Sequence, residues 1–535
     1  MFFINNTLFW KLFSRRALIC FIIIIFLFLS CILRVAVIAV SDISSANVNQ
    51  NRLRITLGKA RGTIFDKNMI PLTNNTEKII AVVTPTPRAI TAISAVLKGN
   101  ELENVLNVLK QGKPATCVVP KIIECDGIIC TKVFTNSNDN INHFIGYTDT
   151  DNKGVCGLEL AYDNILNYKN DISVYYECNA KGEILPGCEP ETQCPSVFSN
   201  GIVSTFDINI QNIAESAAES IERGCVIIAD AKNGKIRASV SRPEFKLSEL
   251  SAILNDSNSP LLNRAINSYN VGSVFKPCVA IAGIENGYGE FKYICTGSCE
   301  IIDRFFKCHK YDGHSLMNLK SGLANSCNTF FYNFAFLIGR NEIYNTMKNL
   351  KFGKSLALCN NISTDEGSIP SKQSLENIAY LANLSIGQGE LLLSPISILP
   401  LYLAIANNGK YYVPSIIEAT IIEGKTKKYE IGNPTRVMKN ETADILKQYL
   451  ASVLTDGTGI DALPSSVTAA GKTATAQTGK YRDEYEICQG WFCGFFPLEN
   501  PKYVVVVFSE DITNQSESCN KIFAKIADQI TELEN

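Results

Sequence analysis

A serine and a lysine three residues apart, Ser273 and Lys276 in the stretch VGSVFKP, have the side chains of a nucleophile and a base. Pro277 has no N–H to give the carbonyl of Ser273, so we expect a helix that begins near Ser273, with its positive dipole end there. Residues i and i+3 share a helix face, so the Lys276 amine could reach and activate the Ser273 hydroxyl if burial lowers the pKa of the lysine. Taken alone, the pair fits an ordinary surface helix better, because such short matches arise by chance.

Two further motifs carry polar side chains at spacings that suit a substrate cleft. Ser326 stands two residues before Asn328 in SCNTFF, where a tight turn between helices would project a hydroxyl and an amide into one cleft. In AAGKTATAQTG, Lys472 and Thr473 offer a cation and a hydroxyl for a carboxylate, and their small neighbours let a substrate backbone lie beside the strand. Each motif alone is also compatible with a structural turn or with a loop rich in glycine and alanine.

The elements expected around these motifs form one antiparallel sheet with helices inserted between its strands. VIIADAKNGKIRASVS predicts two strands joined by a Lys-Asn-Gly turn, and WFCGFFP and YVVVVFSED predict two more near the C-terminus. Helical patterns lie between them, in IQNIAESAAESIE, NTFFYNFAFLIG and ISILPLYLAIANNG. Strands at both ends of one segment predict a single sheet in which the first and last strands meet.

Residues 41–200 show a different sequence pattern, in which short apolar runs alternate with polar turns. KIIAVVTPTPRAI predicts a strand closed by prolines, AISAVLKG and ELENVLNVLKQ predict helices, and GVCGLELAYDNILN predicts a helix start after a glycine turn. We expect this part to be a modest α+β module without a catalytic cluster.

The N-terminal segment predicts a membrane anchor. Residues 17–40, ALICFIIIIFLFLSCILRVAVIAV, are apolar apart from Arg34, and a run of about 20 apolar residues spans a bilayer. Lys11, Arg15 and Arg16 precede this run, which predicts that residues 1–16 stay in the cytoplasm and that the chain after residue 40 lies outside. A cleaved signal peptide is the alternative, but the run is long for one and lacks an A-x-A-like exit.

The composition of the chain limits its partners. Its 535 residues with 46% apolar content suffice for more than one packed domain. Lys+Arg 50 against Asp+Glu 52 gives a net charge of −2 without a strongly basic stretch, so we expect no nucleic acid partner.

The nineteen cysteines allow three interpretations. Disulfides outside a membrane could form in three clusters: Cys117, Cys125 and Cys130; Cys178, Cys188 and Cys194; Cys295, Cys299 and Cys308. Other cysteines suit small buried hydrophobic positions equally well, such as Cys225, Cys278 and Cys327. The third interpretation is a zinc site in the group Cys295, Cys299, Cys308, His309 and His314. Their spacing fits no finger or ribbon pattern, so we expect neither a metal nor another cofactor.

Together, the three motifs in this order match the S-x-x-K, S-x-N and K-T-G set of penicillin-binding proteins and β-lactamases. Other segments are similar, in the same order, to segments of class B penicillin-binding proteins: RGTIFDKNMIPL, GLELAYDNIL, STFDINIQ, NRAINSYNVGSVFKP, SIGQGELLLSPI, IANNGKYYVP and GWFCGFFP. The likeness covers about residues 57 to 510. The chain thus resembles a class B penicillin-binding protein, a monofunctional peptidoglycan D,D-transpeptidase of the serine penicillin-recognising family.

The resemblance implies a multidomain α+β fold in a single-pass protein of the cell membrane. We expect a cytoplasmic tail (1–16), a transmembrane anchor (17–40), a pedestal or dimerisation-type α+β domain (41–200) and a penicillin-binding transpeptidase domain (201–535). The last domain would have a β-lactamase-like antiparallel sheet with helices on both faces and would lie outside the cytoplasm. Since only about 25 residues follow the last predicted strand, we expect no C-terminal PASTA modules such as those of some relatives.

The resemblance also implies how the nucleophile would act. Ser273 would attack the carbonyl of a D-Ala–D-Ala stem peptide and form an acyl-enzyme, with Lys276 as proton acceptor. Backbone N–H groups of Ser273 and Thr475 would form the oxyanion hole, worth about 3 kcal/mol for each donor. β-Lactams would acylate the same serine, because their strained amide mimics the peptide.

The remaining motif residues would bind the peptide and move protons. Ser326 would relay a proton to the leaving group, Asn328 would bind the peptide amide, and Lys472 with Thr473 would hold the terminal carboxylate. An amine from a neighbouring stem peptide would then release the acyl group as a cross-link. The implied protein partners are a polytopic glycan polymerase and other cell-wall proteins.

Two positions depart from the family pattern. The family has proline where Val271 stands, which should loosen the turn before the nucleophile slightly. Ala474 stands where the K-T-G motif has glycine, and its methyl group could narrow the substrate-binding edge or alter β-lactam affinity. We expect activity to survive, because one methyl group is small.

Several rival interpretations remain open. A catalytically weakened scaffold of a cell-wall complex, a membrane-anchored β-lactamase and a D,D-carboxypeptidase would share the three motifs. A β-lactam sensor with a metalloprotease would need H-E-x-x-H, which the sequence lacks. A bifunctional synthase would need a glycosyltransferase domain where residues 41–200 carry class B signatures. Whether the chain acts in elongation, in the division septum or in sporulation is also open.

Overall fold

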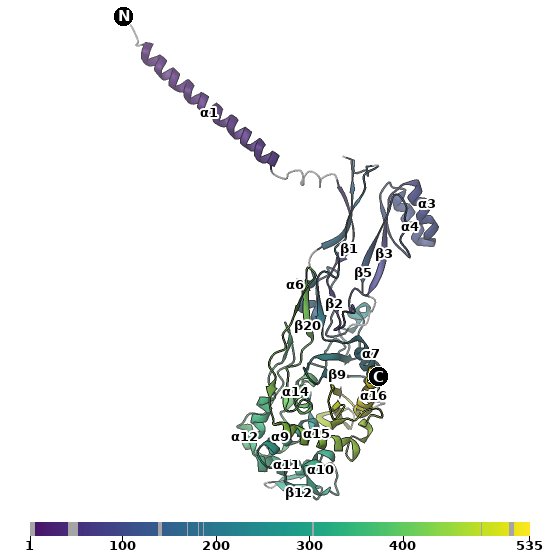
Figure 1. The fold of residues 1–535 in the computed structure, drawn as a ribbon, viewed down its shortest axis with the longest axis vertical. Coiled ribbons are helices and arrows are strands. Elements are labelled where there is room, and N and C mark those ends of the chain that lie inside the picture. Colours follow the sequence, from purple (N-terminus) through teal and green to yellow (C-terminus); the bar gives the residue numbers. More distant parts are fainter. Residues whose placement is uncertain are drawn as a thin grey trace. The chain divides into compact units, whose positions relative to one another are not determined.

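The computed structural model describes the chain in two compact units (Figure 1). The described residues are 6–40, 52–136, 142–167, 170–179, 181–185, 187–301, 304–482, 484–512 and 518–535. The first unit contains Met1–Lys59, Lys78–Val133 and Asn170–Pro195, and the second contains Ala60–Glu77, Phe134–Lys169 and Ser196–Asn535. Residues 1–5 of the expected tail and residues 41–51 of the expected pedestal lie outside the described residues.

The apolar N-terminal segment forms one long helix, α1 (Asn6–Val40). Its stretch Ser14–Val37 has a mean hydropathy of 3.0 and is long and apolar enough to cross a membrane. The helix expected over residues 17–40 is therefore confirmed, and its place in a membrane stays a prediction.

The first unit also contains two three-stranded sheets and a pair of helices. The strand orders are β1-β6-β7 and β4-β3-β5, with β1 (Arg52–Ala60), β3 (Thr76–Val83), β4 (Ala115–Val119), β5 (Ile128–Thr135), β6 (Asn170–Glu177) and β7 (Glu191–Gln193). Helices α3 (Pro87–Val96) and α4 (Gly99–Leu109) share a core with the second sheet, in which Ala81, Ile93 and Val105 are buried. The strand and the two helices predicted from the sequence are confirmed.

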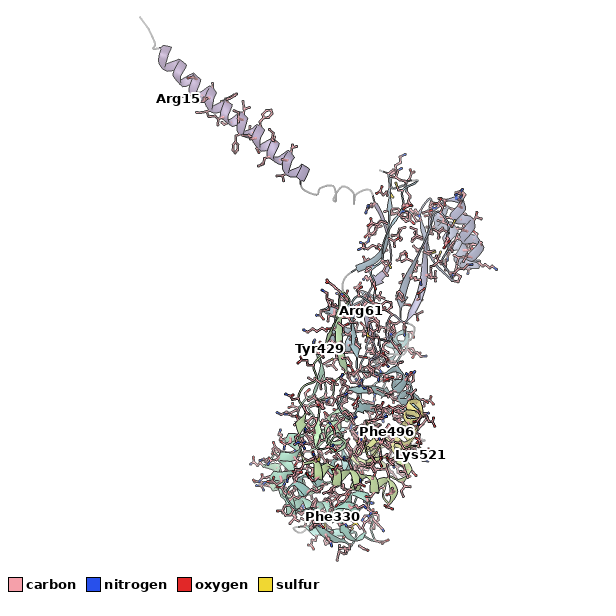
Figure 2. The ribbon with its side chains drawn as sticks, in the orientation of Figure 1. Arg15, Arg61, Phe330, Tyr429, Phe496 and Lys521 are labelled. Carbon is pink, nitrogen blue, oxygen red and sulfur yellow. The ribbon has the colours of Figure 1, made fainter. Side chains whose placement is uncertain are left out.

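Two segments that precede residue 200, residues 60–77 and 134–169, pack within the second unit. Strand β2 (Thr63–Phe65) joins a sheet in the order β2-β8-β20-β21, with β8 (Gly201–Ser204), β20 (Ile417–Ile422) and β21 (Lys425–Lys428). The buried Arg61 side chain, labelled in Figure 2, pairs with Glu159 at 2.6 Å and with Asp163 at 2.8 Å, in the short helices α5 (Gly157–Ala161) and α6 (Asp163–Leu166). These pairs join the two segments, because separating them would leave a buried charge without a partner. The predicted boundary at residue 200 stays a prediction.

A five-stranded antiparallel sheet in the order β10-β9-β25-β24-β23 forms the centre of the second unit. Its strands are β9 (Gly224–Asp230), β10 (Ile236–Arg242), β23 (Ala470–Arg482), β24 (Tyr485–Phe496) and β25 (Tyr503–Ser509). Strand β9 pairs with both β10 and β25, which confirms the predicted hairpin and the predicted meeting of first and last strands. Six consecutive residues of β25 are buried, so both faces of the sheet are covered. Helices α7 (Ile208–Ala217), α14 (Pro395–Ala406) and α16 (Cys519–Glu534) pack on the sheet.

The second unit also contains further helices and pairs of short strands. The helices are α8 (Leu250–Ile253), α9 (Lys276–Glu285), α10 (Leu319–Ala324), α11 (Asn328–Ile338), α12 (Arg340–Asn349), α13 (Ile378–Ser385) and α15 (Asn440–Thr455). The paired short strands are β11 (Tyr269–Asn270) with β18 (Leu392–Leu393), β12 (Lys292–Cys295) with β15 (Ser315–Asn318), β13 (Ser298–Ile301) with β14 (Arg304–Lys307), β16 (Ala357–Cys359) with β17 (Ile362–Ser363), and β19 (Lys410–Tyr411) with β22 (Thr435–Arg436). Phe330 of α11, labelled in Figure 2, packs its ring on those of Phe291 and Phe334, and this aromatic core supports the first turn of α11.

Candidate active site

Ser273 lies in a short 3-10 helix, Gly272–Phe275, that leads into α9. Because Pro277 has no N–H, the carbonyl of Ser273 accepts a hydrogen bond from the N–H of Lys276 instead. The helix start predicted near Ser273 is therefore confirmed, and the regular α-helix begins at Lys276. Gly272 has a φ of +64° and donates its N–H to the carbonyl of Gly387 at 2.8 Å. A Cβ on Gly387 would lie 2.0 Å from the Gly272 oxygen, so the turn and the SIGQGE segment approach as closely as glycine permits.

The Lys276 amine is fully buried and joins the second motif. It donates hydrogen bonds to the Ser326 carbonyl at 2.6 Å, to the Ser326 Oγ at 3.1 Å and to the Asn328 Oδ1 at 2.8 Å. The amine also lies 5.3 Å from the centre of the Phe331 ring. Burial lowers the pKa of Lys276 to about 7, so a large fraction of this amine is uncharged at neutral pH.

The second motif lies in the predicted tight turn between α10 and α11. Ser326 has a φ of +52°, a left-handed conformation that is uncommon for a residue other than glycine. Its carbonyl points to the Lys276 amine, and the hydrogen bond at 2.6 Å offsets part of the cost of this conformation. The turn therefore places the Ser326 hydroxyl and the Asn328 amide beside one amine, as the spacing predicted.

Lys472 of the third motif is also fully buried, on strand β23. Its amine donates to the carbonyl of Thr473 at 3.1 Å. Burial, together with the charge of Lys276, lowers the pKa of Lys472 well below that of an exposed lysine. A bound carboxylate would favour the charged form of the Lys472 amine. Lys472 would therefore bind a carboxylate more tightly when its amine is protonated.

Residues from all three motifs line one cleft of about 520 Å³. The predicted site residues that line it are Ser273, Ser326, Asn328, Thr473, Ala474 and Thr475. The two predicted lysines lie beneath this surface, since both are fully buried. The cleft thus brings together six residues from three separate segments, and the two lysine amines lie under its floor.

The cleft also contains residues that the motif reasoning missed. Thr458 accepts or donates a hydrogen bond with Thr473, with 2.8 Å between the two hydroxyl oxygens, and His309 and Trp491 line the same cleft. Thr458 stands between Gly457 and Gly459. A hydroxyl residue flanked by two glycines is a sequence feature from which Thr458 could have been predicted to line the cleft. His309 gives no comparable signal, because its place depends on the packing of a distant hairpin.

The methyl group of Ala474 lies next to the turn that carries the nucleophile. Strand β23 is at the edge of the five-stranded sheet, as the predicted binding of a substrate strand requires. Along it Ala474 and Ala476 are buried whereas Thr475 is exposed. A Cβ placed on Gly272 would lie 3.3 Å from the Ala474 Cβ and 3.1 Å from the Ala476 Cβ. The Ala474 methyl therefore packs under the nucleophile turn.

The chain matches a known family model over much of its length. The model described as the penicillin binding protein transpeptidase domain matches residues 224–531. Stage V sporulation protein D of Bacillus subtilis is 27% identical over 385 residues, which cover 69% of this chain and 58% of that protein. Peptidoglycan D,D-transpeptidase MrdA of Haemophilus influenzae is 25% identical over 72% of this chain and 64% of its own length. The chain thus spans less than two thirds of the length of these two relatives, whereas MrdA of Salmonella typhimurium aligns over 97% and 96% at 24% identity.

Solved structures share the fold at low sequence identity. Penicillin binding protein 3 of Mycobacterium tuberculosis in its apo form matches with a TM-score of 0.66 and 20% identity, over 90% of this chain and 97% of that one. PBP2 of Helicobacter pylori, solved in complex with MreC, matches with a TM-score of 0.65 and 21% identity, over 90% and 99%. The resemblance predicted from the motifs is confirmed: this chain belongs to the penicillin-binding protein transpeptidase family, as a class B member.

Proposed function

We propose that this chain is a peptidoglycan D,D-transpeptidase that works through an ester on Ser273. The observation that carries the proposal is the hydrogen-bonded group of Lys276, Ser326 and Asn328 beside the cleft that Ser273 lines. An amine with a pKa of about 7 can accept a proton from a hydroxyl and give it up again within one cycle. The arrangement therefore fits acyl transfer in two steps.

In the first step the Ser273 Oγ attacks the carbonyl carbon of the penultimate D-Ala, and its proton passes to the Lys276 amine. The bond between that carbon and the nitrogen of the terminal D-Ala breaks. The proton then passes through the Ser326 hydroxyl, 3.1 Å from the amine, to the leaving nitrogen. The oxyanion would accept hydrogen bonds from the N–H groups of Ser273 and Thr475. The products are free D-Ala and an ester on Ser273.

In the second step an amine from another stem peptide attacks the ester carbon. A new amide bond forms, the ester bond breaks, and the proton of the amine returns to the Ser273 oxygen through the same groups. The edge strand β23 would hold the donor peptide, with Thr473 and the charged form of Lys472 on its carboxylate. Attack by water instead would make the chain a carboxypeptidase or a β-lactamase.

The placement in the cell is part of the same proposal. Helix α1 would anchor the chain in the membrane, with the tail in the cytoplasm and the chain after residue 40 outside. The first unit would act as the pedestal. A PBP2 of Helicobacter pylori has been solved in complex with MreC, which supports a place in a protein complex. We propose that a glycan polymerase also belongs to that complex.

Labelling with fluorescent penicillin tests the acyl-enzyme. We expect the full chain in detergent to form one covalent adduct, located at Ser273 by mass spectrometry. Ser273→Ala should abolish the adduct, whereas Ser216→Ala, on helix α7, should keep it. An unlabelled wild-type chain beside a labelled control protein would contradict the acyl-enzyme and favour the scaffold interpretation.

A product assay separates transpeptidation from hydrolysis. Nascent glycan strands with pentapeptide stems, made by an added glycan polymerase, should yield cross-linked dimers and free D-Ala. Release of D-Ala with trimmed stems and without dimers would contradict transpeptidation and leave the acyl-enzyme intact.

A further inference from the structure

Two side chains of strand β24 hold the backbone of Asn270, three residues before Ser273. The N–H of Asn270 donates to the Gln489 Oε1 at 3.1 Å, and its carbonyl accepts a hydrogen bond from the Trp491 Nε1 at 2.9 Å. Both side chains are buried, with 8% of Gln489 and 1% of Trp491 exposed. These bonds explain why a glutamine amide and an indole N–H lie in the core, and the reaction steps proposed above use neither group.

Strand β24 can reach Asn270 only with side chains. Strand β11 contains two residues and pairs with β18, with Asn270 opposite Leu392. Strand β24 is paired with β23 along one edge and with β25 along the other, so its backbone groups are used within the sheet. Side chains two residues apart on a strand point to the same face, so Gln489 and Trp491 both reach Asn270. The segment that carries the nucleophile is thus attached to the five-stranded sheet at this residue.

The residues on either side of the nucleophile are held by other segments. The N–H of Gly272 donates to the Gly387 carbonyl at 2.8 Å, and the carbonyl of Val274 accepts a hydrogen bond from the buried Tyr402 hydroxyl at 2.9 Å. These two bonds restrain the turn itself. The bonds to Asn270 restrain the segment that enters the turn, so the direction of the turn toward the cleft depends on them.

Val271 follows Asn270 directly and lacks the restraint that the family pattern has there. Proline fixes φ at about −65°, whereas the φ of a valine can vary. Val271 has a φ of −90°, and Asn270 before it lies in a strand, the conformation that a following proline favours. The backbone at this position therefore suits proline although the chain has valine, and the restraint of the turn is left to hydrogen bonds.

We propose that Gln489 and Trp491 are positioning residues that orient Ser273 for attack through the backbone of Asn270, in place of the restraint that proline would give. The inference rests on the proposed function, since it takes Ser273 as the nucleophile. Trp491 also lines the cleft, whereas Gln489 is not among the described residues that line it. Gln489 therefore acts through Asn270, and its substitution gives the cleaner test.

Loss of the Gln489 amide should change the rate of acylation and not the affinity for the substrate. The N–H of Asn270 would lose its partner, and the turn could then move relative to the cleft. A displacement of 1 Å at a reacting atom can cost about 10²-fold in rate. The residues expected to bind the carboxylate, Lys472 and Thr473, lie on β23 and would keep their positions. A variant that was merely less stable would not show this selective loss.

Stopped-flow labelling of the full chain in detergent, at several concentrations of fluorescent penicillin, separates the two quantities. Gln489→Ala should lower the acylation rate constant about 10- to 100-fold, with the half-saturating concentration within about threefold of wild type. Trp491→Phe, which keeps a ring and loses the N–H, should lower the rate constant less. The matched control is Gln211→Ala, which should keep both quantities. The buried Gln211 amide bonds the backbone of Ser239, on strand β10, at 2.9 Å and 3.0 Å.

Val271→Pro provides the rescue. In the Gln489→Ala background it should restore the rate constant to within about threefold of wild type, because proline fixes the φ that the lost bond no longer restrains. In the wild-type background it should change the rate constant less than about threefold. An unchanged rate constant in Gln489→Ala, an equal loss in Gln211→Ala, a loss of affinity alone, or no recovery with Val271→Pro would each overturn the proposal. Should Gln489→Ala not fold, Trp491→Phe is judged by the same criteria.

Hydrogen exchange of residues 268–275 tests the same positioning without acylation. Exchange should rise in Gln489→Ala, fall again with Val271→Pro and stay at the wild-type level in Gln211→Ala. If penicillin does not label the wild-type chain, the proposed function fails and the exchange alone decides on Gln489. Unchanged exchange in Gln489→Ala would overturn the positioning role.

Discussion

The two sides of the turn at Ser326, Cys327 and Asn328 are stabilised in opposite ways. On one side the Lys276 amine lies next to the Phe331 ring of α11 and is fully buried. On the other side the hairpins of residues 292–318 leave large apolar side chains in solvent and meet at four metal-ligating groups. The core side holds the amine by burial and by hydrogen bonds to Ser326 and Asn328, whereas the hairpins have few buried side chains besides the groups at which they meet. Each of the following changes acts on one side and leaves the other intact.

The largest effect is expected on the core side, from Lys276→Met. This substitution removes the proposed base and keeps the apolar volume, so the rate of acylation by a fluorescent penicillin should fall about 10²- to 10⁴-fold. Thermal stability should fall, because the substitution leaves the Ser326 carbonyl and the Asn328 Oδ1 without the hydrogen bonds that the amine donates. Stopped-flow labelling and a thermal melt measure the two. Lys447→Met, at a buried lysine paired with Asp444, is the control and should keep the acylation rate. A rate for Lys276→Met within threefold of wild type would contradict the role of base.

A smaller effect should follow on the hairpin side, from His314→Ala. Loss of the imidazole that contacts the Cys295 and Cys308 sulfurs would loosen the group that includes Cys327 and allow Ser326 and Asn328 to shift. A displacement of 1 Å at such a site can cost about 10²-fold in rate. Hydrogen exchange of residues 292–318 should rise while that of α9 stays protected. Cys299→Ser should change neither readout. An unchanged exchange pattern in His314→Ala would show that the hairpins do not depend on this side chain.

The pH dependence of the acylation rate should depend on Lys276, on the core side, and not on the hairpins. The uncharged form of Lys276 is the active base, and its pKa is about 7, so the rate should be constant above pH 8 and fall about tenfold per pH unit below pH 6. Measuring second-order labelling rates between pH 5 and pH 9 checks this. A profile that is flat across pH 7 would mean that another group accepts the proton.

The smallest effect is expected from Ala474→Gly. The Ala474 methyl packs under the Gly272 turn, so its removal should lower the free energy of unfolding by about 0.5–1 kcal/mol and change the acylation rate less than threefold. Ala476→Gly, the next buried alanine on β23, should behave alike. A large rise in acylation for Ala474→Gly alone would instead support the narrowing of the cleft expected from the motif.

Much of the fold could be predicted because local patterns are strong in it. Strand runs such as YVVVVFSED and the Lys-Asn-Gly turn identify β25 and the β9–β10 hairpin, and strands at both ends of the segment predicted that β9 and β25 pair. The segments RGTIFDKNMIPL and GLELAYDNIL are recognisable one by one, but only the fold joins them, through Arg61, Glu159 and Asp163. Contacts between segments nearly a hundred residues apart leave no periodic signal in either segment.

The sequence by itself determined the three motifs and their order, the apolar N-terminal helix and the family. Only the tertiary structure decided that both lysines are buried, that the Lys276 amine meets Ser326 and Asn328, and that Cys327 completes a group with Cys295, Cys308 and His314. The reason is physical: residue types and short spacings are local properties, whereas the pKa of an amine and the distance between two thiols depend on which distant segments pack around them.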